Sequence, residues 1–193
     1  MKVVVFDRME ECTEAEVQRM LPLVSEQRRE QALKYKHTFG QFCCLKAGLM
    51  LKEGLEVMGY GLRDFCYNEH GKPYIENGPY FSISHCKEGI AVAIDDKPIG
   101  IDIEAIRHAN EELIERTMNE EEKSKVERQK SKEERDREFT RLWTQKEAIV
   151  KAVGTGIMSF EQLQGIRNQE SGFRIQTIEK EKYIYSIALW TIM

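Results

Sequence analysis

The chain has 193 residues, enough for one large domain or two small ones with a buried core. Its 29 basic and 33 acidic side chains leave a net charge of -4. General nucleic-acid binding, which needs a basic surface to displace counterions, is therefore not expected. The five cysteines are odd in number and show no CxxC spacing, so neither a disulfide framework nor a zinc site is predicted.

The first element is a strand over residues 3–6, an apolar run far too short for a signal sequence or a membrane span. We therefore expect a soluble, cytoplasmic protein with no membrane partner. Residues 25–36 are predicted to form a helix with Ser25 as its N-cap, and residues 42–58 a second helix with apolar residues at helical spacing. This half is completed by an expected strand over 64–68, a loop over 70–73, a turn over 77–79 and a strand over 80–85.

A hairpin is expected next, with arms over 90–94 and 99–104 joined by the turn-forming residues 95–98. Residues 110–138 are dominated by charge, which is typical of exposed helices. The last expected elements are a helix over 138–153 that ends at Gly154 and Gly156, and a hairpin of 172–178 with 183–190. Both halves contain a strand, helices and a strand pair, which predicts an α+β fold of two similar lobes, 1–98 and 99–193.

The predicted strand over 99–104 carries acidic side chains on one face. Asp102 and Glu104 alternate with the isoleucines and share their face with Gly100, about 7 Å apart along the strand. Like charges at this distance raise each other's pKa unless a cation intervenes. Mg²⁺ prefers such oxygen ligands, and Gly100 would leave space for a ligand. An ordinary half-exposed strand is the alternative interpretation.

Trp143, Glu147 and Lys151 follow one another at intervals of four and so share one side of the predicted helix. Glu147 would complete a metal site, and Lys151 beside it could hold a phosphate. The alternative is a surface ion pair with Trp143 in the core. Lys146, about 100° round the helix, is expected to be a contact at the rim of the site.

Ser84 and His85 lie at a predicted strand end, where a hydroxyl, an imidazole and backbone N–H groups could bind a phosphate. A hydrolytic Ser-His pair is not favoured, because neighbours on a strand diverge and no Gly-x-Ser-x-Gly elbow is present. Lys72 and Arg28 are further candidates for anion contacts. Taken singly, each of these two is most often a solvated surface charge.

Four motifs, read in order, resemble those of the 4'-phosphopantetheinyl transferases, and most closely the larger, two-lobed, monomeric class that activates synthetases and acyl carriers. They are GKP at 71–73, FSISH at 81–85, GIDIE at 100–104 and WTQKEAIVKAVGTG at 143–156. The helix near residues 25–35 extends the similarity to most of the chain. The departures are Gln31 and Cys43-Cys44, where such enzymes often carry basic residues, and Ser82 in place of a frequent asparagine.

The resemblance implies transfer of 4'-phosphopantetheine from coenzyme A to a serine of an apo carrier protein, with release of 3',5'-ADP and an active site between the lobes. The implied Mg²⁺ ligands are Asp102, Glu104 and Glu147, with Glu147 also the expected base and Lys151 the group that contacts the phosphate and assists proton movement. The implied coenzyme A contacts are Arg28, Lys72, Ser84, His85 and Lys151, with His85 on the 3'-phosphate.

Partner docking is expected beside the charged segment, where basic side chains could meet the acidic helix of a carrier: Lys123, Lys125, Arg128 and Lys130. Two other functions stay open at this point. A non-catalytic module that binds coenzyme A or a nucleotide would explain the phosphate contacts without needing three carboxylates. A helical interaction protein built on residues 110–138 is the second.

Overall fold

The computed structural model describes residues 1–61, 65–154, 164–165 and 172–191. Its strands form two three-stranded antiparallel sheets, with orders β1-β5-β4 and β6-β8-β7, and a two-stranded ribbon of β2 and β3. The strands are β1 Lys2–Phe6, β2 Cys66–Tyr67, β3 Pro73–Tyr74, β4 Tyr80–Cys86, β5 Gly89–Asp95, β6 Ile99–Ala105, β7 Phe173–Glu179 and β8 Tyr183–Trp190. A mixed fold of helices and strands is therefore confirmed.

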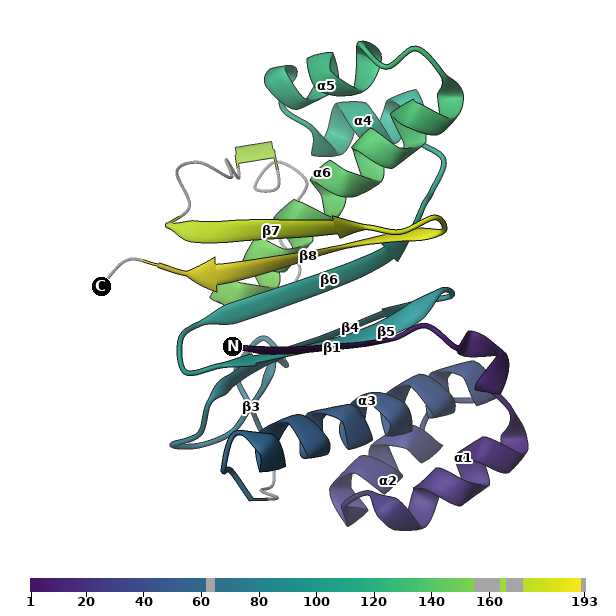
Figure 1. Cartoon of the computed structure of the whole chain (residues 1–193), viewed down its shortest axis with the longest axis vertical. Helices are drawn as coiled ribbons and strands as arrows, with labels where there is room; N and C mark the ends of the chain where they lie inside the picture. Colours follow the sequence, from purple (N-terminus) through teal and green to yellow (C-terminus); the bar gives the residue numbers. More distant parts are fainter. Residues whose placement is uncertain (62–64, 155–163, 166–171, 192–193) are drawn as a thin grey trace.

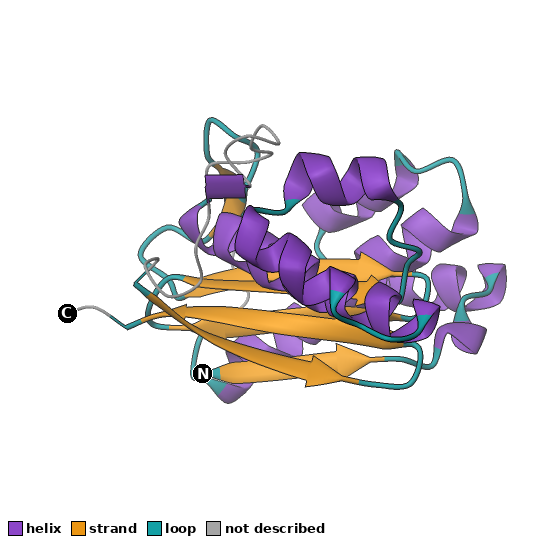
Figure 2. Ribbon diagram, turned by 90° about the horizontal axis from the view of Figure 1, so that it is seen from above, coloured by secondary structure: helices purple, strands orange, loops and turns teal. Residues whose placement is uncertain are grey.

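Six α-helices accompany these sheets among the described residues: α1 Glu14–Met20, α2 Glu26–Leu33, α3 Thr38–Val57, α4 Glu111–Thr117, α5 Glu120–Glu127 and α6 Lys132–Val153. Two short 3₁₀ turns, η1 Met9–Glu11 and η2 Leu21–Leu23, flank α1. Figure 1 shows α1 to α3 gathered beside β1, β4 and β5, and α4 to α6 gathered beside β6, β7 and β8. Viewed from above, helices lie over the layer of strands (Figure 2).

The helix boundaries follow local capping chemistry. Ser25 accepts a hydrogen bond from the Arg28 amide and caps α2 as predicted. Helix α6 begins at residue 132, six residues earlier than expected, because Ser131 and Glu134 form a reciprocal capping box. It ends as predicted at Gly154, whose φ of 81° is a left-handed conformation that glycine adopts at little cost.

Other boundaries differ from the sequence-based expectation. Helix α1, capped by the Thr13 hydroxyl, was not expected, and α3 begins four residues before residue 42. Strand β2 covers only two of the residues expected over 64–68, and residue 64 lies outside the described part of the chain. Gly156, the second expected helix stop, also lies outside it.

The predicted hairpin of residues 90–94 with 99–104 is wrong. Strand β5 pairs with β1 along one edge and with β4 along the other, so no edge is left for β6. Strand β6 crosses to the second sheet and pairs with β8, from Ile99 opposite Leu189 to Ala105 opposite Tyr183. The expected C-terminal hairpin is confirmed, with β7 and β8 paired in register from Phe173 and Trp190.

Successive side chains of β5 alternate between two apolar clusters. Ile90, Val92 and Ile94 enter a cluster with apolar residues of α3, whereas Ala91 and Ala93 enter a second cluster with the isoleucines of β6. The apolar face of β6 predicted from its period-two pattern is thus confirmed. Burial of these side chains is the main force that holds the two sheets together.

Gly100 has a structural role that differs from the predicted one. A Cβ built on this residue would lie 1.9 Å from the backbone oxygen of Ala148 and 2.5 Å from the backbone nitrogen of Ala152. The space that we expected a ligand to use is therefore filled by the backbone of α6. This close approach sets α6 directly against β6, and it brings the acidic strand and the Glu-Lys helix together.

Candidate active site

One pocket of about 620 Å³ collects most of the residues predicted from the sequence. Its walls come from β4, β6, α6 and the loop before β3, which are segments far apart in the chain. Seven of the eight predicted site residues line it: Lys72, Ser84, His85, Asp102, Glu104, Glu147 and Lys151. The eighth, Arg28, does not. The volume falls within the range of pockets that hold cofactors and drug-sized ligands.

The centre of the pocket wall is a three-membered cluster of Ser84, Asp102 and Lys151. The Lys151 ammonium lies 2.6 Å from Asp102 Oδ1 and 2.8 Å from Ser84 Oγ. The Ser84 hydroxyl lies 2.9 Å from the same carboxylate oxygen. Only 4% of the Asp102 side chain is exposed, and its second oxygen, Oδ2, is buried without a hydrogen-bond partner. A buried carboxylate oxygen without a partner is costly, which suggests a place for a cation or a donor.

The two glutamates on this wall are destabilised as anions. Burial, together with the charge of Asp102, raises the pKa of Glu104 to about 6, and Arg107 and Lys151 oppose the shift. The pKa of Glu147 is raised by burial and by Asp102, against the pull of Lys151. Each carboxylate therefore senses its neighbours, and a bound cation would relieve their repulsion. Arg107 was not predicted as part of the site, and no motif points to it.

The donor chemistry of this wall fits a magnesium ion. Carboxylate oxygens are the ligands that Mg²⁺ favours, and Asp102 Oδ2 is available. As the side chains stand, no three acidic, imidazole or thiol groups among the described residues are close enough together to hold a metal. Asp102, Glu104 and Glu147 therefore line one pocket, but their side chains are not arranged as a complete set of metal ligands.

Lys72 connects the loop before β3 to the end of α6. Its ammonium donates to the backbone oxygens of Lys151, at 2.5 Å, and Ala152, at 3.2 Å, while Asn68 Nδ2 donates to the Gly154 oxygen at 2.9 Å. Burial lowers the pKa of the Lys72 ammonium. A cation beside the last carbonyls of a helix complements the helix dipole, so that Lys72 closes this side of the pocket as well as lining it.

His85 borders the pocket beyond the Ser84 cluster, and its ring meets the Phe39 ring edge-on at 6.1 Å between centroids. The residue is exposed, but neighbouring protein atoms exclude part of the water around the imidazole. This desolvation and the positive charge of Lys151 lower the pKa of His85. The neutral form is therefore favoured near pH 7. Trp143 stands on the same pocket wall as predicted, stacked against Phe139 at 6.2 Å.

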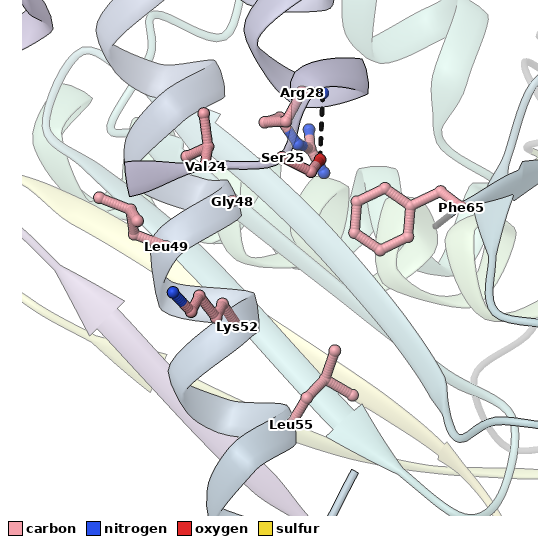
Figure 3. Close-up of a pocket in the computed structure, with 8 residues that line it drawn as sticks. All are labelled: Val24, Ser25, Arg28, Gly48, Leu49, Lys52, Leu55 and Phe65. Atoms are coloured by element: carbon pink, nitrogen blue, oxygen red, sulfur yellow. Dashed lines mark hydrogen bonds between the residues drawn. The ribbon is translucent and has the colours of Figure 1, made fainter. Parts of the chain in front are cut away.

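Arg28 lies in a separate, small cavity of about 30 Å³ (Figure 3). It is 8% exposed, and its guanidinium lies over the Phe65 ring at 4.9 Å from the centroid. A weak contact of 3.8 Å joins its Nη1 to Cys44 Sγ, and its Nε is buried without a partner. Gly48 makes room for it, since a Cβ there would be 3.1 Å from the Arg28 side chain. Arg28 therefore lines this small cavity and not the large pocket.

Lys146 was expected at the rim of the site, and this prediction is wrong. Its side chain is 1% exposed, and its ammonium lies 2.6 Å from Glu122 of α5 and 2.8 Å from the Thr117 backbone oxygen. The residue faces the helices α4 and α5 rather than the pocket. Two buried groups of opposite charge compensate each other there, which accounts for their burial.

The charged segment beside α6 folds into α4 and α5 as expected of exposed helices. Part of its positive charge is already paired, since Lys123 contacts Glu115 at 2.6 Å and Lys125 contacts Glu121 at 2.7 Å.

Within the described residues, no helix has the length and apolar character needed to cross a lipid bilayer.

Comparison with known proteins shows which family the chain resembles. Residues 98–190 match the model of the 4'-phosphopantetheinyl transferase superfamily. A 4'-phosphopantetheinyl transferase of Bacillus subtilis is 34% identical over 148 residues, which cover 74% of this chain and 65% of that protein. The 4'-phosphopantetheinyl transferase gsp of Aneurinibacillus migulanus is 29% identical, over 69% of this chain and 57% of its own length. The chain therefore spans less than two thirds of the length of each of these two relatives.

Proposed function

We propose that this chain, which matches the 4'-phosphopantetheinyl transferase superfamily over residues 98–190, transfers the 4'-phosphopantetheine group of coenzyme A to a serine hydroxyl of an apo carrier protein. One observation carries the proposal. Three carboxylates and Lys151, from motifs some 40 residues apart, line one pocket in a chain related to such transferases. A module that only binds nucleotides needs the cationic and hydroxyl groups of this pocket but has no use for three carboxylates.

The reaction replaces the phosphoanhydride bond of the coenzyme A pyrophosphate with a phosphodiester bond to the carrier serine. The carrier serine oxygen forms a bond to the phosphorus that bears pantetheine, and the bond from that phosphorus to the oxygen of the leaving 3',5'-ADP breaks. Glu147 is the proposed base for the serine proton, because its carboxylate lines the pocket on the same wall as Asp102 and Lys151. Lys151 offers positive charge to the phosphates, and no covalent intermediate with the protein is needed.

Mg²⁺ would be held by Asp102, Glu104 and Glu147, and would supply charge neutralisation for the pyrophosphate. The chain's own residues prepare the pocket for this charge. Lys151 and Ser84 keep Asp102 Oδ1 occupied, while Oδ2 is left without a partner. Lys72 and the helix end hold the wall in place, and His85 in its neutral form offers an N–H donor to the nucleotide end of coenzyme A.

We also infer the organisation expected from the sequence. The division into lobes 1–98 and 99–193, related by a pseudo-twofold, is supported by one three-stranded antiparallel sheet in each half. The pocket draws residues from both halves, in agreement with an active site between the lobes. Coenzyme A and an apo acyl or peptidyl carrier are the proposed partners of a monomer.

Intact-mass analysis of an apo acyl carrier protein, incubated with this protein and coenzyme A, tests the proposal. A gain of one phosphopantetheine with Mg²⁺, and no gain with EDTA, is the expected result. No gain on any acyl or peptidyl carrier, despite measurable coenzyme A binding, would contradict it and favour the non-catalytic module.

A further inference from the structure

Thr144 and Gln145 belong to the WTQKE motif on α6, but they do not line the pocket. Both are buried, Thr144 at 0% and Gln145 at 8% exposure. The Thr144 hydroxyl lies 2.8 Å from Ser186 Oγ of β8, and Gln145 Nε2 donates to Thr177 Oγ1 of β7 at 2.9 Å. Ser186 Oγ also lies 2.9 Å from Thr177 Oγ1. The motif therefore has a second, buried side that contacts the sheet.

Ser186 stands in the middle of a row of side chains that crosses this sheet. In the strand register it lies opposite Asp102 of β6 on one side and opposite Thr177 of β7 on the other. Residues directly opposite each other on antiparallel strands project from the same face of the sheet. The three side chains of the row contact, in turn, Lys151, Thr144 and Gln145 of α6. The row thus joins a carboxylate of the pocket wall to the buried side of the motif.

The three hydroxyls form a chain of hydrogen bonds with a single direction. A hydroxyl has one proton to donate. Thr144 donates its proton to the Arg141 backbone oxygen at 3.0 Å, so it accepts the proton of Ser186. Ser186 then accepts from Thr177, and Thr177 accepts from the Gln145 amide. The chain begins and ends on α6, and every hydroxyl proton in it has a partner. A buried network that is satisfied in this way holds its members in one arrangement.

We infer that Ser186 and Thr144 are positioning residues, which fix α6 on the sheet in the place that the pocket requires. The pocket depends on this, because Asp102 comes from β6 whereas Glu147 and Lys151 come from α6. The glycine of β6 lets the helix approach closely, and the hydroxyl chain fixes its position along the sheet. Misplacement of a reacting group by about 1 Å can cost about 100-fold in rate. The inference rests on the proposed function, because these three pocket residues act on coenzyme A only in that proposal.

Four variants test the chain and supply a control. Ser186→Ala and Thr144→Val each remove one hydroxyl of the chain, and Thr144→Ser keeps the hydroxyl in a smaller side chain. Tyr183→Phe is the matched control on the same strand. It also removes one hydroxyl from a buried residue, but this hydroxyl donates to Asp7 at 2.9 Å and lies on the opposite face of β8. Tyr183 is not among the residues that line the pocket.

The affinity for coenzyme A, measured by calorimetry with Mg²⁺ and with EDTA, reports the arrangement of the pocket without any transfer. The ratio of the two affinities measures the contribution of a cation held by residues of both β6 and α6. We expect Ser186→Ala and Thr144→Val, in the folded protein, each to lower this ratio about threefold or more and the transfer rate about tenfold. Their combination should lose little more than either alone, because both changes break the same hydrogen bond. Thr144→Ser should recover most of the loss. Tyr183→Phe should lower the melting temperature and leave the ratio unchanged.

Several results would overturn the inference. An unchanged ratio in Ser186→Ala and Thr144→Val, despite lower melting temperatures, would leave the hydroxyl chain with a purely structural role. An equal fall of the ratio in Tyr183→Phe would mean that the loss of any buried hydroxyl of β8 disturbs the pocket. If one of the two chain variants does not fold, the other decides between these outcomes.

Failure of the proposed function can be told apart from failure of the inference. If the unmodified protein binds coenzyme A more tightly with Mg²⁺ but transfers nothing to any carrier, the proposed function fails while the affinity ratio still decides the inference. If Mg²⁺ does not change the affinity of the unmodified protein, the positioning role falls together with the metal site.

Discussion

Lys146 and Lys151 stand five residues apart on the same helix, α6, and have opposite surroundings. Lys146 is buried against Glu122 and a backbone carbonyl and is not among the residues that line the pocket. Lys151 is 29% exposed on the pocket wall and contacts a carboxylate whose second oxygen has no partner. Five residues turn a helix by about 140°, so the two lysines face different elements. Two lysines of one motif can therefore have different roles. Lys146 is structural because its contacts are buried, whereas Lys151 can act on a ligand because it reaches the pocket.

The largest expected effects concern the acidic groups on the Lys151 side. Glu104→Ala and Glu147→Ala should each lower the transfer rate by about 10²- to 10⁴-fold, because a base or a metal ligand is lost. Folding should be little affected, since both carboxylates are destabilised as anions in the metal-free protein. Initial rates and thermal melting without metal provide the two readouts. Near-normal turnover by both variants would refute the proposed metal site.

Next in size is the effect of Lys146→Met on stability. Removal of the ammonium leaves Glu122 buried without its ion-pair partner, although the Asn119 amide still donates to it, and breaking a buried pair in this way costs about 3–5 kcal/mol. Urea unfolding measures this free energy. Lys151→Met is the matched control on the same helix; it also leaves a buried carboxylate, Asp102, without its ion pair, so a loss of stability is expected there too, but it alone should lower transfer by the folded protein. If Lys146→Met lowered transfer by the folded protein and Lys151→Met did not, the comparison between the two lysines would be broken.

A smaller effect is expected from pH in the metal-free protein. Because the pKa of Glu104 is raised to about 6 in the fold, the folded state holds this proton at pH values where the unfolded chain has released it. The contribution of Glu104 to stability is therefore greatest below the unfolded pKa and is lost as the pH rises to about 6. Glu104→Gln should remove that decline and be more stable than the unmodified protein at pH 7. Unfolding curves from pH 4 to pH 7 would reveal it, and parallel pH profiles for the two proteins would speak against the raised pKa.

The smallest expected effect concerns carrier binding, at a surface that contains neither Lys146 nor Lys151. Reversal of Lys125 and Arg128 to glutamate should raise the KM for the carrier severalfold while kcat changes little, because rim charges mainly affect association. Steady-state kinetics with a fixed, saturating concentration of coenzyme A gives both constants. An unchanged KM would remove the docking role expected of the charged segment that contains Lys125 and Arg128.

Local elements were predicted well wherever the signal lies in neighbouring residues. Ser25 and Gly154 end their helices as their chemistry predicts, and the apolar period of β6 places its isoleucines in the core. The hairpin of β5 with β6 failed because turn residues between two strands do not reveal that β1 already occupies the second edge of β5. The start of α6 was missed because charged residues on an exposed first turn resemble a solvated segment, although the capping box at Ser131 was present in the sequence.

The sequence by itself determined which residues carry the chemistry, since residue type and spacing placed Asp102 and Glu104 on one face of a strand and Glu147 and Lys151 on one side of a helix. Only the tertiary structure decided what these residues contact. Gly100 admits the helix backbone instead of a ligand, Lys146 turns into the core, Arg28 lies in its own cavity and Ser84 joins two sheets. The physical reason is that spacing within a segment defines a direction, whereas a partner comes from a distant segment that packing alone brings into contact.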